Sequence, residues 1–214
     1  MKIIMRKMDV VGLHSKFFRE HGFVLNHSQM SFEKVFPHGK QVVFFHLVEG
    51  LKNSSLQYNL GIRINAVEDL IHKYLPTFSN YADQSITLAQ TPDKLGSTYP
   101  QKIKVFANNE LQKVVSEVEE FFLHTGFKWL DEMIDPVTLE QEFLQRKENP
   151  FEDFNLEESA FRSTALSKLY NPKDYPILRQ SFLEKINSLE MTPFTIASFL
   201  QFLFHLDKWK LVAT

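Results

Sequence analysis

The segment from Ser54 to Asn65 constrains the fold most, because its side chains alternate between apolar and polar with a period of two. The apolar set is Leu56, Tyr58, Leu60, Ile62 and Ile64, and the intervening set is Ser55, Gln57, Asn59, Gly61 and Arg63. A period of two is typical of a strand with one buried and one solvated face, as antiparallel sheets have. The segment therefore predicts a strand of an antiparallel sheet.

Two further strands are predicted before it, at 29–36 and 41–49, joined by four-residue hairpin loops at 37–40 and 50–53. These loop lengths place Phe32 opposite Phe45, and Phe45 opposite Tyr58. Apolar residues then share one face, and a slip of one residue would separate them. We therefore expect Phe45 and Tyr58 to be buried neighbours.

Most of the remaining chain has helical periodicity. Helices are predicted at 9–21, where Gly22 provides the C-cap, and at 66–75, 109–122, 136–146, 157–170, 174–188 and 193–207, with short strands at 85–89 and 102–107. Strands followed by helices indicate an α+β fold, with an antiparallel β-meander sheet packed by helices and then a C-terminal helical bundle. We expect a sheet domain at 1–148 and a helical appendage at 149–214, or one continuous domain.

The predicted register also arranges the opposite face of the sheet. It places Ser31, His46 and Gln57 in one row and Glu33, Phe44 and Asn59 in the next. Arg63 follows two rows further along its strand. The candidate binding residues are Glu33, His46, Gln57, Asn59 and Arg63. Such a mixed surface could hold a small ligand or a peptide, or it could be the solvated face of an ordinary sheet or a layer beneath a helix.

Motifs for catalysis or cofactor binding are missing from the sequence. The chain contains no cysteine and no Gly-rich phosphate loop. Glu117, Glu120 and His124 have helical spacing that suits a metal, but they lie opposite an apolar stripe and should face solvent. His14 and His21 are too far apart to share a metal. We expect no cofactor and no tightly bound transition metal.

Charge is distributed unevenly along the chain. Residues 1–107 have a net charge of +5, residues 108–214 of −7, and the segment 117–158 alone of −10. The acidic segment is either a solvated helical face or an attractive surface for a basic partner, and it repels nucleic acid.

The segment from Phe194 to Leu206 is apolar around nearly its whole helical circumference. A helix of this kind must be buried on all sides. It is either the central helix of the bundle or meets another subunit. We expect it to be mostly buried within its own chain, and any apolar strip left over to form a two-fold interface.

No stretch of 18 apolar residues and no secretory signal is evident, so we expect a cytoplasmic protein. The order of elements, with Glu20-His21-Gly22-Phe23, Val42-Val43-Phe44-Phe45 and Tyr58-Asn59-Leu60-Gly61-Ile62, resembles a bacterial family catalogued as a domain of unknown function. The resemblance implies a cytoplasmic α+β fold and no particular activity.

Three functions are compatible with these patterns. The first is a non-catalytic binding or interaction protein with a protein or small-molecule partner. The second is a small enzyme in which His46 is the general base and Glu33 its orienting residue or acid. The third, which the patterns favour least, is a nucleic-acid binder that uses the basic first half.

Overall fold

The computed structural model describes residues 6–49, 54–75, 82–96, 98–105, 108–145, 156–186 and 191–209. The chain divides into two compact units: unit 1 comprises residues 1–63 and 88–134, and unit 2 comprises residues 64–87 and 135–214. The helical unit therefore takes in two segments that precede the boundary predicted at 149, and that boundary itself lies outside the described residues.

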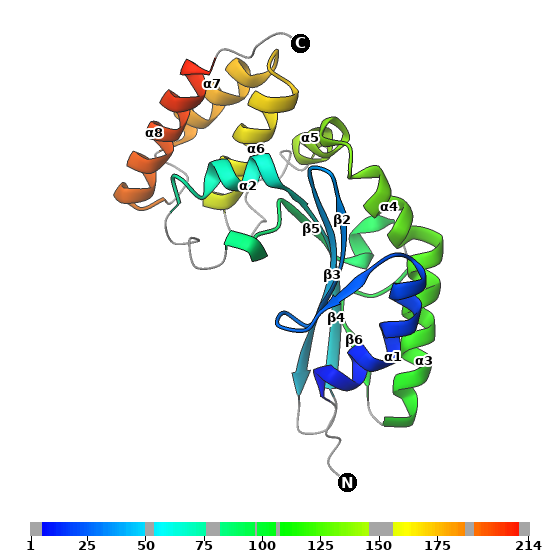
Figure 1. Ribbon diagram of the computed structural model, residues 1–214. Coiled ribbons are helices and arrows are strands. Elements are labelled where there is room, and N and C mark those ends of the chain that lie inside the picture. The colour runs from blue at the N-terminus through cyan, green and yellow to red at the C-terminus, as the bar shows by residue number, and fades with distance from the viewer. Residues whose placement is uncertain are drawn as a thin grey trace. The chain divides into compact units, whose positions relative to one another are not determined.

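Unit 1 contains a six-stranded antiparallel sheet within the described residues (Figure 1). The strands are β1 (Val24–Asn26), β2 (Ser31–Phe36), β3 (Gly39–Glu49), β4 (Ser54–Ile64), β5 (Leu88–Gln90) and β6 (Ile103–Val105). They are ordered β1-β2-β3-β4-β5, and β6 pairs with the other end of β4. The predicted α+β fold is confirmed.

One face of this sheet is covered by helices (Figure 1). They are α1 (Lys7–Glu20), α3 (Asn108–Phe121), a π-helical turn (Phe122–Gly126) and α4 (Phe127–Glu132), and a short 3-10 helix, η2 (Pro92–Leu95), precedes β6. The core between helices and sheet is aromatic, and the Phe18 ring stacks on Phe32 with centroids 4.5 Å apart. Gly22 has a φ of 83°, as the predicted C-cap requires.

The predicted packing of the buried sheet face is confirmed. Phe45 and Tyr58 are each 1% exposed, and their ring centroids lie 5.5 Å apart. Apolar side chains of β4 line this face at 0–1% exposure: Leu56, Tyr58, Leu60, Ile62 and Ile64. The alternation in the sequence therefore identified the side of β4 that meets the helices. The prediction that the other face is solvated is wrong for the second half of the strand, where every residue from 58 to 64 is buried.

The predicted register between the first two long strands is wrong by two residues. Phe36 pairs with Gly39 and Phe32 with Val43, so the hairpin loop has two residues instead of four. Gly39 can enter the ladder because it has no Cβ, which would collide there with the backbone carbonyl oxygen of Arg63. A shift of two residues changes the partners and preserves the faces, so Phe32 and Phe45 still share the buried side.

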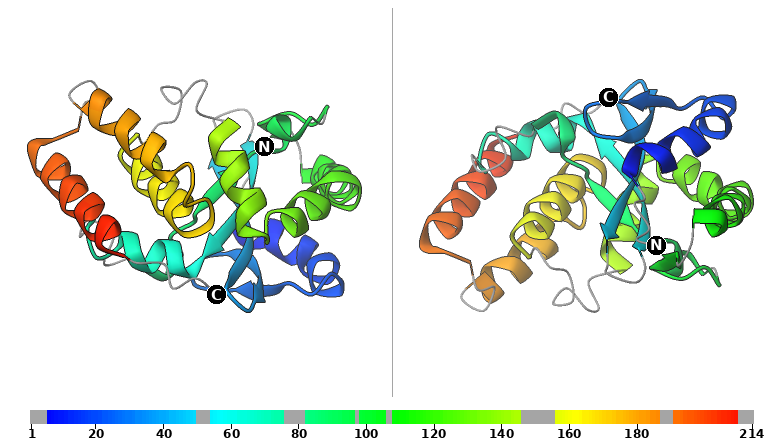
Figure 2. Two further views of the ribbon diagram at one scale, coloured as in Figure 1. Left: turned by 90° about the horizontal axis from the view of Figure 1, so that it is seen from above. Right: turned by 90° about the horizontal axis from the view of Figure 1, so that it is seen from below.

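Unit 2 is helical. Its helices are α2 (Asn65–Ile71), α5 (Pro136–Gln145), α6 (Leu156–Tyr170), α7 (Tyr175–Lys185) and α8 (Pro193–Lys208). Helix α6 contacts each of the other four, and Figure 2 shows the orange and red helices α7 and α8 alongside the yellow α6. The Phe161 ring of α6 lies 4.9 Å from Phe199 and 5.0 Å from Phe202. The central helix is thus α6, and the prediction that α8 could occupy this place is wrong.

None of the helices in the described part of the chain is long and apolar enough to cross a membrane.

Candidate interaction surface

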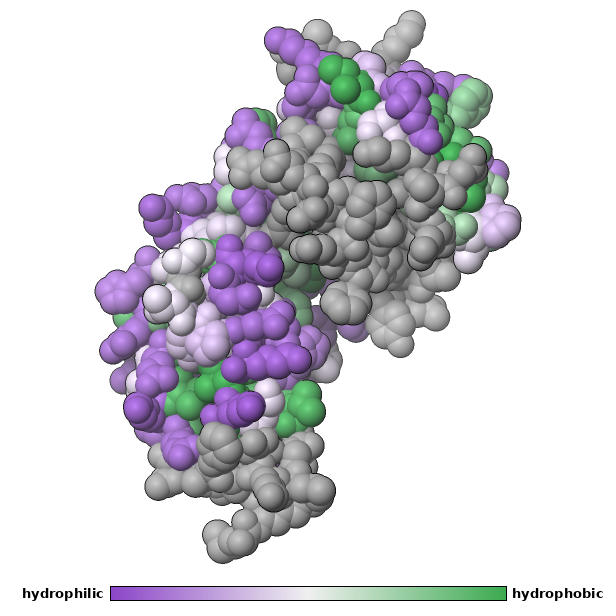
Figure 3. All heavy atoms as spheres, turned by 180° about the vertical axis from the view of Figure 1, so that it is seen from behind, coloured by the Kyte–Doolittle hydropathy of each residue, from purple (hydrophilic) through white to green (hydrophobic). Residues whose placement is uncertain are grey.

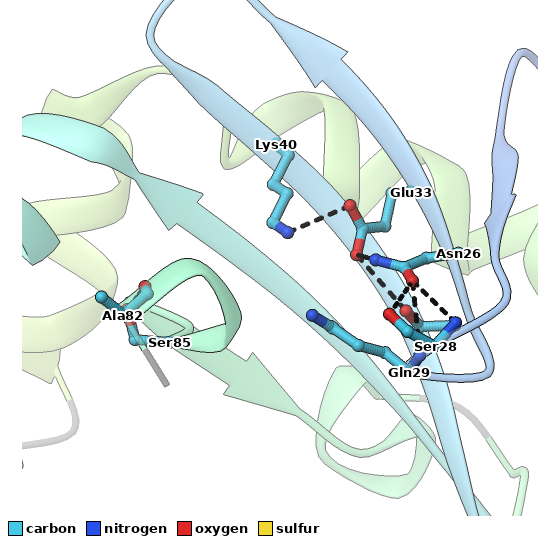
Figure 4. A network of polar contacts seen from close by, with 8 residues as sticks. Asn26, Ser28, Gln29, Glu33, Lys40, Ala82 and Ser85 are labelled. Carbon is cyan, nitrogen blue, oxygen red and sulfur yellow. Dashed lines mark hydrogen bonds and ion pairs between the residues drawn. The ribbon is translucent and has the colours of Figure 1, made fainter. Parts of the chain in front are cut away.

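Glu33 is held in a network of polar contacts on the outer face of the sheet (Figure 4). Its Oε2 accepts a hydrogen bond from Lys40 Nζ at 3.0 Å, and its Oε1 accepts one from Asn26 Nδ2 at 3.0 Å. The side chains of Glu33 and Lys40 are each only 15% exposed. Because these contacts join β1, β2 and β3, the carboxylate is engaged in holding the strands together.

His46 lies apart from Glu33. Glu33 pairs with Val42, and His46 follows four residues later on β3, about 13 Å along the strand. The predicted rows, which placed these side chains next to each other, are wrong for the same reason as the hairpin. His46 is exposed and its ring meets Phe44 edge-on, with centroids 5.8 Å apart. The enzyme hypothesis therefore loses its acid–base pair.

The other candidate residues lie along β4 in different surroundings. Gln57 is half-buried, whereas Asn59 is 8% exposed and Arg63 is 5% exposed. Asn59 Nδ2 has no hydrogen-bond acceptor among the described residues. The expected pairing of His46 with Gln57 stays a prediction. The structure does not gather the five candidate residues into one site.

We predict that Asn59→Leu leaves the free energy of unfolding unchanged or raises it by about 1 kcal/mol, because leucine removes a buried donor that lacks an acceptor. Urea denaturation followed by circular dichroism measures this change. A loss of more than about 2 kcal/mol would show that the carboxamide stabilises the fold through its hydrogen bonds.

A buried polar network that the sequence did not predict connects α1, α3 and β4. His14 is fully buried, with Nδ1 3.0 Å from Glu119 Oε1 and Nε2 2.9 Å from Tyr58 Oη. Burial, with the nearby Tyr99 and Glu119, raises the pKa of Tyr58 well above its usual value, so the phenol stays neutral beside the His14 ring. The three residues are far apart in sequence, and no local pattern links them. Their hydrogen bonds provide partners for the buried imidazole of His14 and the buried hydroxyl of Tyr58.

The predicted solvent-facing position of the acidic side of α3 is confirmed. Glu117, Glu120 and His124 are all exposed. Across the described ranges, no three His, Asp or Glu side chains lie together as metal ligands could.

Helix α8 has one buried side and one exposed apolar side. Phe199, Phe202, Leu203 and Leu206 are at most 1% exposed, as predicted for burial within the chain. The prediction that every side is buried is wrong: Phe194 is 65% exposed, Leu200 is 44% exposed and Phe204 is 60% exposed. Together with the exposed Ala197, these residues form a stripe at helical spacing, which we call the α8 strip. Figure 3 shows hydrophobic side chains at the surface of this unit, at the upper right.

Charged residues are missing from α8 before its last two residues, Asp207 and Lys208. No Asp, Glu, Lys or Arg occurs from Met191 to Leu206. The exposed side of α3, by comparison, carries Lys113, Glu117 and Glu120. Charged residues normally cover the water-facing side of a helix, and they are depleted where a surface is covered by a partner. The α8 strip therefore has the composition of an interface.

Comparison with protein-family models, curated proteins and solved structures finds no match for this chain. The resemblance to a bacterial family stays a prediction.

Proposed function

We propose that this chain is a non-catalytic, cytoplasmic interaction protein that contacts a protein partner through the α8 strip. The observation that carries the proposal is the exposed apolar side of α8 around Phe194, Leu200 and Phe204, in a segment without charged residues from Met191 to Leu206. Large exposed apolar patches commonly mark protein–protein contacts.

The energetics of the strip favour a covering partner. Burial of each large apolar side chain gains roughly 1.5–3 kcal/mol relative to full exposure, and part of this gain is still available at all three positions. The opposite side of α8 already packs on α6 through Phe199 and Phe202. Rotation of the helix would expose those residues in exchange, so a rotation of α8 alone cannot bury the strip.

The chemistry of the strip defines the partner. A surface that offers aromatic and aliphatic groups without charge suits an apolar protein surface. It does not suit nucleic acid, whose phosphates are bound by Lys and Arg. The strongly acidic segment 117–158 also supports a protein partner over nucleic acid.

Site-specific photo-crosslinking in the cells that make the protein tests this proposal. With a benzophenone amino acid in place of Phe204, we expect a discrete covalent adduct with another polypeptide. The same substitution at Leu123, which is 54% exposed in another helical segment, should give none. The absence of an adduct at Phe204, or equal adducts at both positions, contradicts the proposal.

A further inference from the structure

A buried carboxylate in unit 2 lacks the partners that its charge requires. Glu140 of α5 is 1% exposed, and its Oε2 accepts one hydrogen bond, from Asn171 Nδ2 at 3.3 Å. Within the described part of the chain, its Oε1 has no hydrogen-bond donor and no basic side chain forms an ion pair with it. Burial of a charged carboxylate is costly unless a cation or several donors compensate it. The buried Glu68 of the same unit has such compensation, because Arg162 donates to both of its oxygens.

Asn171 joins this carboxylate to a second one. The residue lies in the turn between α6 and α7, where its backbone N–H donates to the carbonyl oxygen of Ser167 at 2.9 Å. Its Nδ2 donates to Asp174 Oδ2 at 2.9 Å as well as to Glu140. One amide –NH2 group therefore lies between two carboxylates, in the position that a bound cation would take.

We infer that Glu140, Asp174 and the carboxamide of Asn171 bind a hard divalent cation, Mg²⁺ or Ca²⁺. Both ions prefer oxygen ligands from carboxylates, amide carbonyls and water. Rotation of the Asn171 carboxamide about its last side-chain bond exchanges Nδ2 for Oδ1, which then faces the two carboxylates as a third oxygen ligand. Asp174 is exposed, so water can reach the ion and complete its coordination. This inference is independent of the α8 strip.

The lysines near this site leave its charge uncompensated. Lys168, in the last turn of α6, has its Nζ 4.7 Å from the centroid of the Tyr175 ring, a cation–π contact. Among the described residues, neither Lys168 nor the exposed Lys173 forms an ion pair with either carboxylate. With two charged ligands and one neutral one, binding should be weak, with a dissociation constant on the order of 0.1–1 mM.

Isothermal titration calorimetry of the full chain, first freed of metal with EDTA and then dialysed, tests the inference. Mg²⁺ and Ca²⁺ are titrated separately, and NaCl keeps the ionic strength constant so that general screening does not contribute. We expect saturable binding of about one ion per chain by at least one of the two, and the tighter of them identifies the ion that the site prefers. No saturable heat from either ion up to about 10 mM overturns the inference.

Variants that keep the shape of a ligand and remove its charge locate the binding site. Glu140→Gln and Asp174→Asn should each weaken binding at least about tenfold. Glu184→Gln, at an exposed position of α7, is the matched control and should bind as wild type does. Because Asp174 is exposed, Asp174→Asn keeps the test decisive if Glu140→Gln does not fold. Binding that neither variant weakens would place the ion elsewhere on the acidic surface and overturn the inference.

Thermal melting provides a second measurement. About 10 mM of the preferred ion should raise the Tm of wild type and of Glu184→Gln by at least about 2 °C, because an ion that binds only the folded state stabilises it. The Tm of Glu140→Gln and of Asp174→Asn should change much less. An equal rise in all four proteins would contradict the assigned site.

Discussion

Arg162→Met should lower the free energy of unfolding at neutral pH by about 3–5 kcal/mol, because it leaves a buried carboxylate without its cation. Glu68 is fully buried, and Arg162 Nε and Nη2 donate to its two carboxylate oxygens at 3.0 Å each. The pair ties α2 to α6 in the centre of unit 2. Urea denaturation of both proteins at pH 7 measures the difference.

The loss in Arg162→Met should shrink as the pH falls. Burial alone would raise the pKa of Glu68, but the charge of Arg162 and hydrogen bonds from Arg162, Thr87 and Ser85 hold it below its usual 4.5. In wild type the Glu68–Arg162 pair stabilises the fold at pH values above the usual pKa of a glutamate. Its contribution is lost as the pH drops through the lowered pKa of Glu68. Without Arg162, burial raises the pKa of Glu68. In acid the Glu68 side chain of the variant is therefore neutral, and its burial costs less stability. The stability difference should therefore be smaller at pH 4 than at pH 7.

The double variant Glu68→Leu with Arg162→Met is the control. Because it removes both charges and retains apolar volume, it should be much more stable than Arg162→Met alone. A double variant as unstable as the single one would show that lost packing, rather than an unpaired charge, causes the effect.

Phe45→Ala should cost about 3–5 kcal/mol, since the ring is lost from a fully packed site. Phe45 contacts the Tyr58 ring, and Lys7 Nζ lies 5.2 Å from the centroid of the Phe45 ring. Val48→Ala, at a site 64% exposed on the opposite face of the same strand, should change the stability by less than about 0.5 kcal/mol. Thermal or urea unfolding distinguishes the two, and similar losses would contradict the assignment of faces.

Periodicity predicted those helices and strands in which the choice between an apolar and a polar residue depends only on whether the side chain is buried. The stripe of α3 through Val115 and Val118 follows directly from which side is buried. The alternation of β4 marks the side that packs against the helices, although residues 58–64 are buried on both sides of the strand. Periodicity did not predict the hairpin before β3, because loop length depends on whether a backbone can close tightly. There Gly39 accepts a close approach that any side chain would prevent.

Which helix is central to the bundle could not be predicted from the sequence either. Helix α6 contains hydroxyl residues that make it look amphipathic, yet Ser163 and Thr164 are buried. Both donate to the carbonyl of Ala160, one turn earlier in the same helix, so their polar groups are satisfied without water. The more hydrophobic α8 could therefore take a peripheral position, with one side left exposed.

The arrangement of the candidate binding residues differs from the predicted one for a related reason. Residues on one face of a sheet share a direction, but their distances depend on register. The two-residue shift moved His46 away from Glu33, and the side chain of Lys40 took its place beside the carboxylate. The hydrophobic surplus of α8 could be recognised from the sequence because it is a property of one continuous segment, but which side is exposed could not.

Hydroxyl-radical footprinting of the protein in the cells that make it and after purification tests the central proposal most directly, because it reports the solvent access of individual side chains. If a partner protein covers the α8 strip, oxidation of Phe194 and Phe204 should be markedly lower in the cells than in the purified protein, while that of exposed Leu123 stays constant. Equal oxidation of Phe194 and Phe204 in both preparations would contradict it.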